Sequence, residues 1–188
     1  MKMLGISGSL RRDSHNTTLL RAAADLLPPS VELEIFESLK AVEPYDEDDD
    51  VGRGPDGARR LRDAIESADA LVIATPEYNS SVPGQLKNAV DWASRPFQQN
   101  ALWGKPAAVV GASTGMFGAV WSQAEMRKTL GAAGARVVDK DLPVGKADDA
   151  FTDDGRLNDQ ELRDRYEEIL DELVALAELS DESERVAA

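Results

Sequence analysis

The 188-residue sequence contains no cysteine and only one histidine. Without cysteine there can be no disulfide, thiolate metal site, cysteine nucleophile or CxxC redox pair, so redox chemistry would require a bound cofactor. No apolar run approaches the length of a membrane-spanning helix, and no basic region precedes an apolar core at the amino terminus. We therefore expect a soluble, cytoplasmic protein that does not contact membranes.

Basic residues are scarce, with 21 Lys and Arg against 35 Asp and Glu, which gives a formal charge of −14. Such a charge repels nucleic-acid phosphates and anionic lipid, so nucleic acid is not an expected partner. An acidic surplus of this kind also resembles the surfaces of proteins from salt-loving organisms, where concentrated salt screens self-repulsion. We therefore expect a halophilic surface.

The most acidic segment, residues 43–50, does not follow the calcium-loop pattern. Val51 stands where that pattern requires glycine, and Gly57 stands where it requires a bidentate glutamate. We interpret the segment as a solvated surface loop and expect no metal site. The lone His15 is likewise interpreted as a solvated loop residue.

Short apolar runs alternate with helical patterns along the whole chain. Buried strands are predicted at Lys2–Ser7, Ala70–Ala74, 105–111 and 135–138, and a half-exposed outer strand is predicted at 31–36 because its apolar residues alternate. This alternation is typical of βαβ units, so the predicted fold class is α/β, a three-layer doubly wound five-stranded parallel sheet. The chain forms one domain, residues 1–179, followed by a frayed acidic tail at 180–188.

Two helix ends carry sequence signals. Leu26 and Leu27 extend the apolar spacing of the first helix, which Pro28 would then end. Asn158 with Glu161 resembles a capping box that opens the last helix.

The loop after the first strand, residues 8–17, combines a glycine with hydroxyl side chains, an amide and arginine. Main-chain N–H groups at the start of a helix, hydroxyl donors and the helix dipole together favour a terminal phosphate. The loop matches neither the Walker pattern nor the dinucleotide GxGxxG pattern, so a phosphate monoester fits better than a pyrophosphate. The alternative is an ordinary polar loop in which Ser14 or Asn16 caps the helix.

The loop after Ala70–Ala74 is rich in polar residues, with Tyr78, Asn79 and two serines, and leads into a helix marked by Leu86 and Val90. In open α/β sheets, ligands bind at the carboxyl ends of the strands, and this turn offers an aromatic ring, hydroxyls and main-chain N–H groups there. An ordinary turn whose Asn79, Ser80 or Ser81 caps the helix remains equally compatible. A further glycine-bearing turn, residues 112–118, follows the strand at 105–111 and gives a weaker signal.

Together, residues 8–16 (GSLRRDSHN) and 76–92 (PEYNSSVPGQLKNAVDW) resemble the signatures of the NAD(P)H-dependent FMN reductase family, which includes chromate and quinone reductases and azoreductases. The resemblance implies a flavodoxin-like fold of strand order 2-1-3-4-5 with FMN between the first and third strands. It implies that the FMN phosphate is held by Ser9, Arg11, Ser14, Asn16 and Thr17. Pro76, Glu77, Tyr78 and Asn79 would border the ring and ribityl chain, and Ser113 and Gly115 would close the far side. The third loop departs from the family at residues 118–121 (GAVW), so its contacts are the least defined.

The resemblance also implies an activity. NADPH or NADH would reduce FMN, which would then reduce a quinone, azo compound, metal oxyanion or free flavin in a ping-pong sequence. No catalytic side chain is assigned, because the protein's task would be orientation and main-chain stabilisation of the reduced ring. Relatives are typically homodimers or homotetramers, so Trp92, Phe97, Trp103 and Trp121 are candidates either for subunit contact or for core packing.

Two other functions remain open. A flavodoxin-like FMN electron carrier that docks redox proteins would also have an acidic surface, although residues 76–92 favour a reductase. A phosphate-ligand binding protein without redox activity is the third possibility.

Overall fold

The computed structural model describes residues 1–187, with side chains described to residue 180. Its sheet has the order β2-β1-β3-β4-β5 with all pairings parallel, as predicted. The strands are β1 (Lys2–Ser7), β2 (Glu32–Ile35), β3 (Ala70–Ala74), β4 (Pro106–Ala112), β5 (Arg136–Val137) and β6 (Pro143–Val144). The two-residue β6, which pairs with the carboxyl end of β4, was not predicted because it carries no strand-length apolar run.

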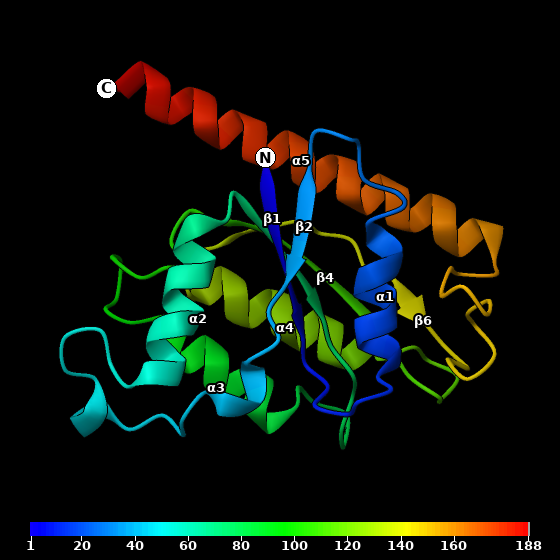
Figure 1. Ribbon diagram of the computed structural model, residues 1–188, viewed down its shortest axis with the longest axis horizontal. Coiled ribbons are helices and arrows are strands. Elements are labelled where there is room, and N and C mark those ends of the chain that lie inside the picture. The colour runs from blue at the N-terminus through cyan, green and yellow to red at the C-terminus, as the bar shows by residue number, and fades with distance from the viewer. Residues whose placement is uncertain (188) are drawn as a thin grey trace.

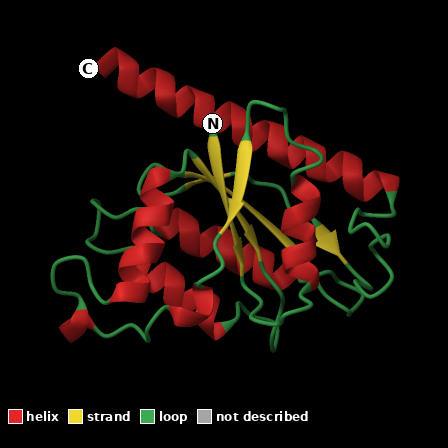
Figure 2. Ribbon diagram, in the orientation of Figure 1, coloured by secondary structure: helices red, strands yellow, loops and turns green. Residues whose placement is uncertain are grey.

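Helices cover both faces of the sheet (Figures 1 and 2). They are α1 (His15–Ala23), α2 (Asp56–Ser67), α3 (Gly84–Ala93), α4 (Val120–Ala132) and α5 (Gln160–Ala187), with short 3-10 turns at Leu39–Ala41 and Glu47–Asp49. Alternate residues of each strand face opposite layers. In β3, Leu71 and Ile73 pack with α2, α3 and α4, whereas Val72 packs with α1 and α5. The predicted three-layer arrangement is therefore confirmed.

Two helix ends differ from the sequence prediction. Helix α1 ends at Ala23, because the Ala24 N–H bonds to the Arg21 carbonyl at 3.1 Å and the chain turns before Pro28. Helix α5 is capped by Asp159, whose Oδ1 accepts from the main-chain nitrogens of Glu161 at 2.8 Å and Leu162 at 3.2 Å. Asn158 instead donates from its side chain to the Asp149 carbonyl.

The acidic segment 43–50 is anchored at both ends, which corrects its interpretation as a wholly solvated loop. The Glu43 carboxylate accepts from the main-chain nitrogens of Gly57 and Ala58, both at 3.1 Å, and so caps α2. Asp50 pairs at 2.9 Å with Arg62, which is 5% exposed. A buried guanidinium requires a carboxylate partner of this kind. The sequence does not show which charged residues become buried, so the pair of Asp50 and Arg62 was not predicted.

No helix within the described residues is long and apolar enough to cross a membrane. The domain boundary at residue 179 and the frayed tail stay predictions, because side chains 181–188 lie outside those described.

Candidate functional site

The carboxyl ends of β1, β3 and β4 lie side by side. Ser7 is in register with Ala74, and Ala74 with Val110. The Gly8 N–H donates to the Ala74 carbonyl at 2.8 Å, which continues this pairing into the first loop. We define loop 1 as residues 8–14, loop 2 as residues 75–83 and loop 3 as residues 113–119. Loops 1 and 2 lie together at the lower end of the sheet in Figure 1.

Loop 1 presents mainly hydrogen-bond donors. Ser14 is the N-cap of α1, and its Oγ accepts from the Thr17 main-chain nitrogen at 3.3 Å. Within the described residues, the main-chain N–H groups of His15 and Asn16 have no hydrogen-bond partner. The exposed Arg11 donates to the Asp13 carbonyl at 3.2 Å, which keeps its guanidinium beside the helix start. Ser14 capping and a phosphate site are compatible, because the capping oxygen accepts while the hydroxyl proton remains available.

Asn16 lies between α1 and β4 rather than open to the loop. Its Nδ2 donates to the Ala112 carbonyl at 2.9 Å, and its Oδ1 accepts from the Ala112 N–H at 2.9 Å. The residue is 3% exposed. The side chain therefore sets the spacing between the helix start and the end of β4, while the Asn16 main-chain N–H faces the loop side of α1.

A hydroxyl chain runs beneath loop 1. Thr17 Oγ1 donates to Ser7 Oγ at 2.9 Å, and Ser7 Oγ contacts the Ser9 carbonyl at 3.5 Å. Ser9 Oγ in turn contacts the Arg11 N–H at 3.5 Å. Sequence analysis omitted Ser7 because it closes an apolar strand; its position directly before the loop glycine was the available signal.

Loop 2 folds into a tight hairpin. Tyr78 and Ser81 exchange main-chain hydrogen bonds at 3.1 and 3.2 Å, and Asn79 and Ser80 between them have φ values of 53° and 59°. Positive φ at both central positions is the signature of a type I′ turn. Tyr78 is 51% exposed at this turn. No side chain caps α3, so the alternative in which Asn79, Ser80 or Ser81 serves as its cap is wrong.

Two carboxylates tie loop 2 to α4. Glu77 Oε2 accepts from the main-chain nitrogens of Trp121 at 3.1 Å and Ser122 at 3.2 Å, and it thus caps α4, whose own N-cap position is Ala119. Glu125 Oε2 accepts from Ser81 Oγ at 2.7 Å and the Val82 nitrogen at 3.1 Å. The Ser81 hydroxyl, followed by the Val82 N–H, lowers the pKa of Glu125. Sequence analysis missed Glu125 because it has the pattern of a solvent-facing helix charge.

Loop 3 packs against the segment after β6. Ser113 Oγ accepts from the Gly115 N–H at 3.1 Å, and the Gly115 carbonyl accepts from the Lys146 N–H at 3.0 Å. A Cβ at Gly145 would lie 2.3 Å from the Met116 carbonyl oxygen, so glycine is needed for this approach. Ser113 and Gly115 therefore lie where β4 ends, beside Ala112 and its partner Asn16.

Large apolar side chains are exposed around the three loops. Met116 and Phe117 are 74% and 60% exposed, and Phe117 packs edge-on against Trp121, which is 49% exposed, with ring centroids 5.1 Å apart. The other aromatic candidates lie elsewhere. Trp92 is fully buried in the core, and Phe97 packs with Trp103 at the amino end of β4. Only Trp121 of the four candidates lies at the loop edge.

His15 is the first residue of α1 and is not a solvated loop residue. Its Nε2 lies 3.0 Å from Asp148 Oδ1, and its ring stacks on Phe151 at a centroid distance of 6.2 Å. These contacts join α1 to the segment that follows β6.

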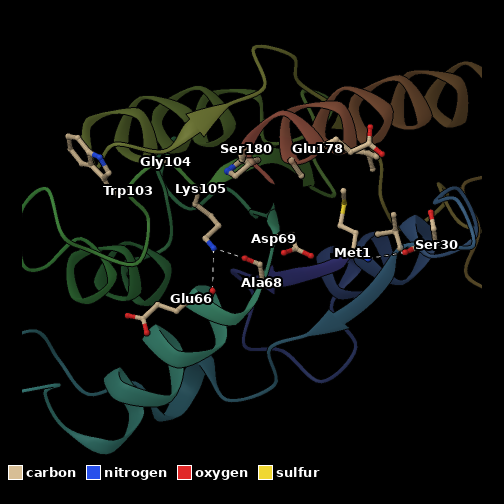
Figure 3. A pocket seen from close by; sticks show the side chains of 14 residues that line it. Met1, Ser30, Glu66, Ala68, Asp69, Trp103, Gly104, Lys105, Glu178 and Ser180 are labelled. Atoms are coloured by element: carbon tan, nitrogen blue, oxygen red, sulfur yellow. Dashed lines mark hydrogen bonds between the residues drawn. The ribbon is translucent and has the colours of Figure 1, made fainter. Parts of the chain in front are cut away.

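A hollow of about 580 Å³ lies at the opposite, amino edge of the sheet (Figure 3). Lys105 lines it and donates to the carbonyl of Ala68 at 2.5 Å, while Asp69 accepts from the Lys2 N–H at 2.6 Å. Its polar groups thus serve the fold, and ligand binding in doubly wound sheets occurs at the other edge. Among the described residues, no cluster of His, Asp or Glu is arranged to hold a metal ion.

A doubly wound sheet whose donor-rich loop and hairpin share one edge defines a flavodoxin-like protein. The family model for NADPH-dependent FMN reductase matches residues 1–149, and the chain belongs to that family. It is therefore an NAD(P)H-dependent oxidoreductase with FMN as its cofactor, as the resemblance implied.

Individual relatives agree with this membership. The chain is 42% identical over 174 residues to an NAD(P)H-dependent FMN reductase of Pseudomonas aeruginosa, covering 92% of this chain and 93% of the relative. It is 40% identical over 163 residues to a quinone reductase of Pseudomonas putida, covering 82% and 83%. Among solved structures, the flavoenzyme NAD(P)H:(acceptor) oxidoreductase FerB of Paracoccus denitrificans superposes with a TM-score of 0.80 at 34% identity, covering 94% and 97%.

Proposed function

We propose that this enzyme passes hydride from NAD(P)H through FMN to a quinone in a ping-pong sequence, with azo compounds, metal oxyanions and free flavin as further candidate acceptors. The observation that carries the proposal is the shared edge of loop 1, rich in donors, and loop 2, an exposed hairpin. Bound FMN supplies the acceptance and donation of hydride. The name of the quinone reductase relative favours quinones among the acceptors.

At the phosphate end, the donor set fits a monoester dianion. Arg11 supplies the cation, the main-chain N–H groups of His15 and Asn16 point from the start of α1, and the hydroxyls of Ser9 and Ser14 add donors. The Thr17 hydroxyl donates to Ser7 and so supports the loop from below. The α1 dipole favours negative charge at the same place. Asn16 acts through its main chain here, because its side chain is engaged with Ala112.

At the ring end, loop 2 is the proposed border. Pro76 and Glu77 lead from β3 into the turn, and Tyr78 offers an exposed ring beside Asn79. Ser113 and Gly115 would close the far side, where the short Ser113 side chain and the lack of a side chain at Gly115 leave room for a flat group. The task of these residues would be to orient the ring, and no side chain is needed as an acid or base.

The ping-pong order follows from one shared surface. In this proposal, the nicotinamide donor and the acceptor would use the same side of the bound ring, so the first product would leave before the second substrate binds. We also propose a homodimer or homotetramer in which the exposed Phe117 and Trp121 meet a second copy, since exposed aromatic pairs are favoured at such interfaces. We also propose that the enzyme is cytoplasmic and that its acidic surface is halophilic.

The decisive experiment is anaerobic addition of NADPH, and separately NADH, to FMN-loaded protein, followed by a quinone. The flavin absorbance should bleach with the nicotinamide and return with the quinone, and initial-rate plots should give parallel lines. Absorbance that no nicotinamide can bleach would support the electron-carrier alternative instead.

A further inference from the structure

Loop 2 holds a backbone conformation that one of its own residues does not favour. Asn79 and Ser80 both have positive φ. Asparagine is a common residue at the centre of a type I′ turn, whereas serine is strained there. Strained turns persist where surrounding contacts hold them, and they gather at functional sites. The residues proposed to border the flavin precede or form this turn, so whatever holds it also places them.

The turn is attached to α4 on both sides. Before it, Glu77 reaches from loop 2 to the first turn of α4. After it, Glu125 reaches back from α4 to Ser81 and Val82. The two attachments differ in purpose. Glu77 satisfies main-chain donors of α4 that any helix start must satisfy, whereas the hydrogen bonds of the Glu125 carboxylate within the described residues all go to loop 2 and cap no end of α4.

We infer that Glu125 is a positioning residue, which holds the Tyr78–Ser81 turn in place for flavin binding through Ser81 Oγ and the Val82 N–H. The inference rests on the proposed flavin site. Glu125 does not contact the reacting atoms; it acts through loop 2. A single carboxylate oxygen serves both donors, and bonds to an ionised acceptor are shorter and stronger than neutral ones.

Hydrogen bonds and nearby charges keep Glu125 ionised. The Ser81 hydroxyl and then the Val82 N–H lower its pKa most, and Lys128 on α4 and Lys87 on α3 lower the pKa further. Lys87 is itself paired with Asp91 at 2.6 Å, so it is shared between two carboxylates. The attachment is therefore present throughout the neutral range and would weaken only as the pH falls through the lowered pKa of Glu125, below the ordinary value of 4.5. Glu125→Gln mimics that loss of charge without changing the shape of the side chain.

The first test uses the protein without flavin. Amide hydrogen exchange at Ser81 and Val82 should be faster in Glu125→Gln than in the wild type. Thr129→Ala is the matched control, because Thr129 lies one turn further along α4 and its hydroxyl donates to the Glu125 main-chain carbonyl at 2.8 Å rather than to the carboxylate. Equal exchange in the wild type and Glu125→Gln would overturn the inference whether or not the protein binds FMN.

The second test measures FMN. Ser81→Ala should raise the FMN dissociation constant by roughly two- to tenfold, the range for one lost hydrogen bond. Glu125→Gln keeps an oxygen that can accept both bonds but loses the negative charge, so it should raise the constant by a smaller factor. The double variant should bind FMN more weakly than either single variant. Its total loss of affinity should be smaller than the product of the two single effects, because both changes weaken the contact between Glu125 and Ser81. At saturating FMN, the visible circular dichroism of the bound flavin should change in Glu125→Gln and not in Thr129→Ala.

The outcomes separate the two proposals. Wild-type protein that binds no FMN would remove the proposed function, while the exchange experiment still tests Glu125. Wild-type binding together with unchanged affinity and dichroism in Glu125→Gln would overturn the positioning role alone. Independent, fully multiplicative effects of Glu125→Gln and Ser81→Ala would do the same. Lower thermal stability with unchanged affinity would show that Glu125 is only structural and would also overturn the inference.

Discussion

Asn16 and Ala112 exchange two hydrogen bonds, each of 2.9 Å, between the first turn of α1 and the last residue of β4. Through this pair, a residue of the first family signature fixes the distance between loop 1 and loop 3. The same side chain therefore supports the fold and the candidate site at once.

Asn16→Ala should be destabilising, because it leaves the Ala112 N–H and carbonyl without partners in the interior. Each unsatisfied group costs about 1 to 3 kcal/mol, so urea denaturation should show a loss of roughly 2 to 6 kcal/mol for the two groups together. Gln99→Ala, which removes an exposed amide, should stay within about 0.5 kcal/mol of the wild type. A loss at Asn16 no larger than that of the control would refute the role of this pair.

Arg11→Ala should weaken FMN binding far more than Arg12→Ala. Arg11 lies beside the helix start and would make a charge-assisted bond to the phosphate, worth about 1.5 to 3 kcal/mol, or roughly ten- to a hundredfold in affinity. Arg12 is equally exposed and adjacent in sequence, which makes it the matched control. Fluorescence titration of FMN gives both constants, and equal effects would mean that loop 1 has been misinterpreted.

The substitution Glu43→Gln tests whether the Glu43 carboxylate anchors the acidic segment to α2. The quantity measured is the free energy of unfolding as a function of pH. The main-chain N–H groups bonded to Glu43, its own first and then those of Gly57 and Ala58, lower the pKa of its carboxyl below the ordinary value of 4.5. A lowered pKa contributes stability that is complete above 4.5 and is lost as the pH falls through the folded value.

Glu43→Gln should thus cost about 1 kcal/mol at pH 7, the usual value of a helix cap, and the difference from the wild type should shrink below pH 4.5. Glu37→Gln is the control at an exposed glutamate, and its stability should stay within about 0.5 kcal/mol of the wild type at pH 7. A difference that stays constant from pH 7 to pH 3 would contradict the cap.

Salt should stabilise the protein if its acidic surface is halophilic. The net charge of −14 repels itself in dilute buffer, and screening shortens the Debye length to about 3 Å at 1 M salt. The melting temperature, followed by circular dichroism, should rise from dilute to molar potassium chloride. A flat or falling melting temperature would count against a halophilic surface.

Trp121→Ser should lower the oligomeric mass measured by light scattering, because it removes half of the exposed Phe117–Trp121 pair at the loop edge. Trp103→Ser is the control, since Trp103 is similarly exposed, at 50% against 49%, but lies at the amino edge. Equal masses for the wild type and Trp121→Ser would place the subunit contact elsewhere.

The sequence by itself determined the sheet and the loops. Apolar runs such as Ala70–Ala74 are buried on both faces, so consecutive residues of the sequence are enough to show where each strand begins and ends. Because the strands are parallel, the loops that follow them must lie at the same edge of the sheet. The donor character of loop 1 and the Ser14 cap were likewise readable from adjacent residues.

Only the tertiary structure decided which side chains hold the site together. Asn16 meets Ala112 across 96 residues, and Glu125 meets Ser81 across 44, so no spacing rule relates either pair. Trp92 and Trp121 both lie in helices, yet Trp92 is buried and Trp121 exposed, because packing against the sheet chooses the face. The strand β6 pairs two residues with β4, too few to form a pattern, and its position becomes defined only when the rest of the sheet is present.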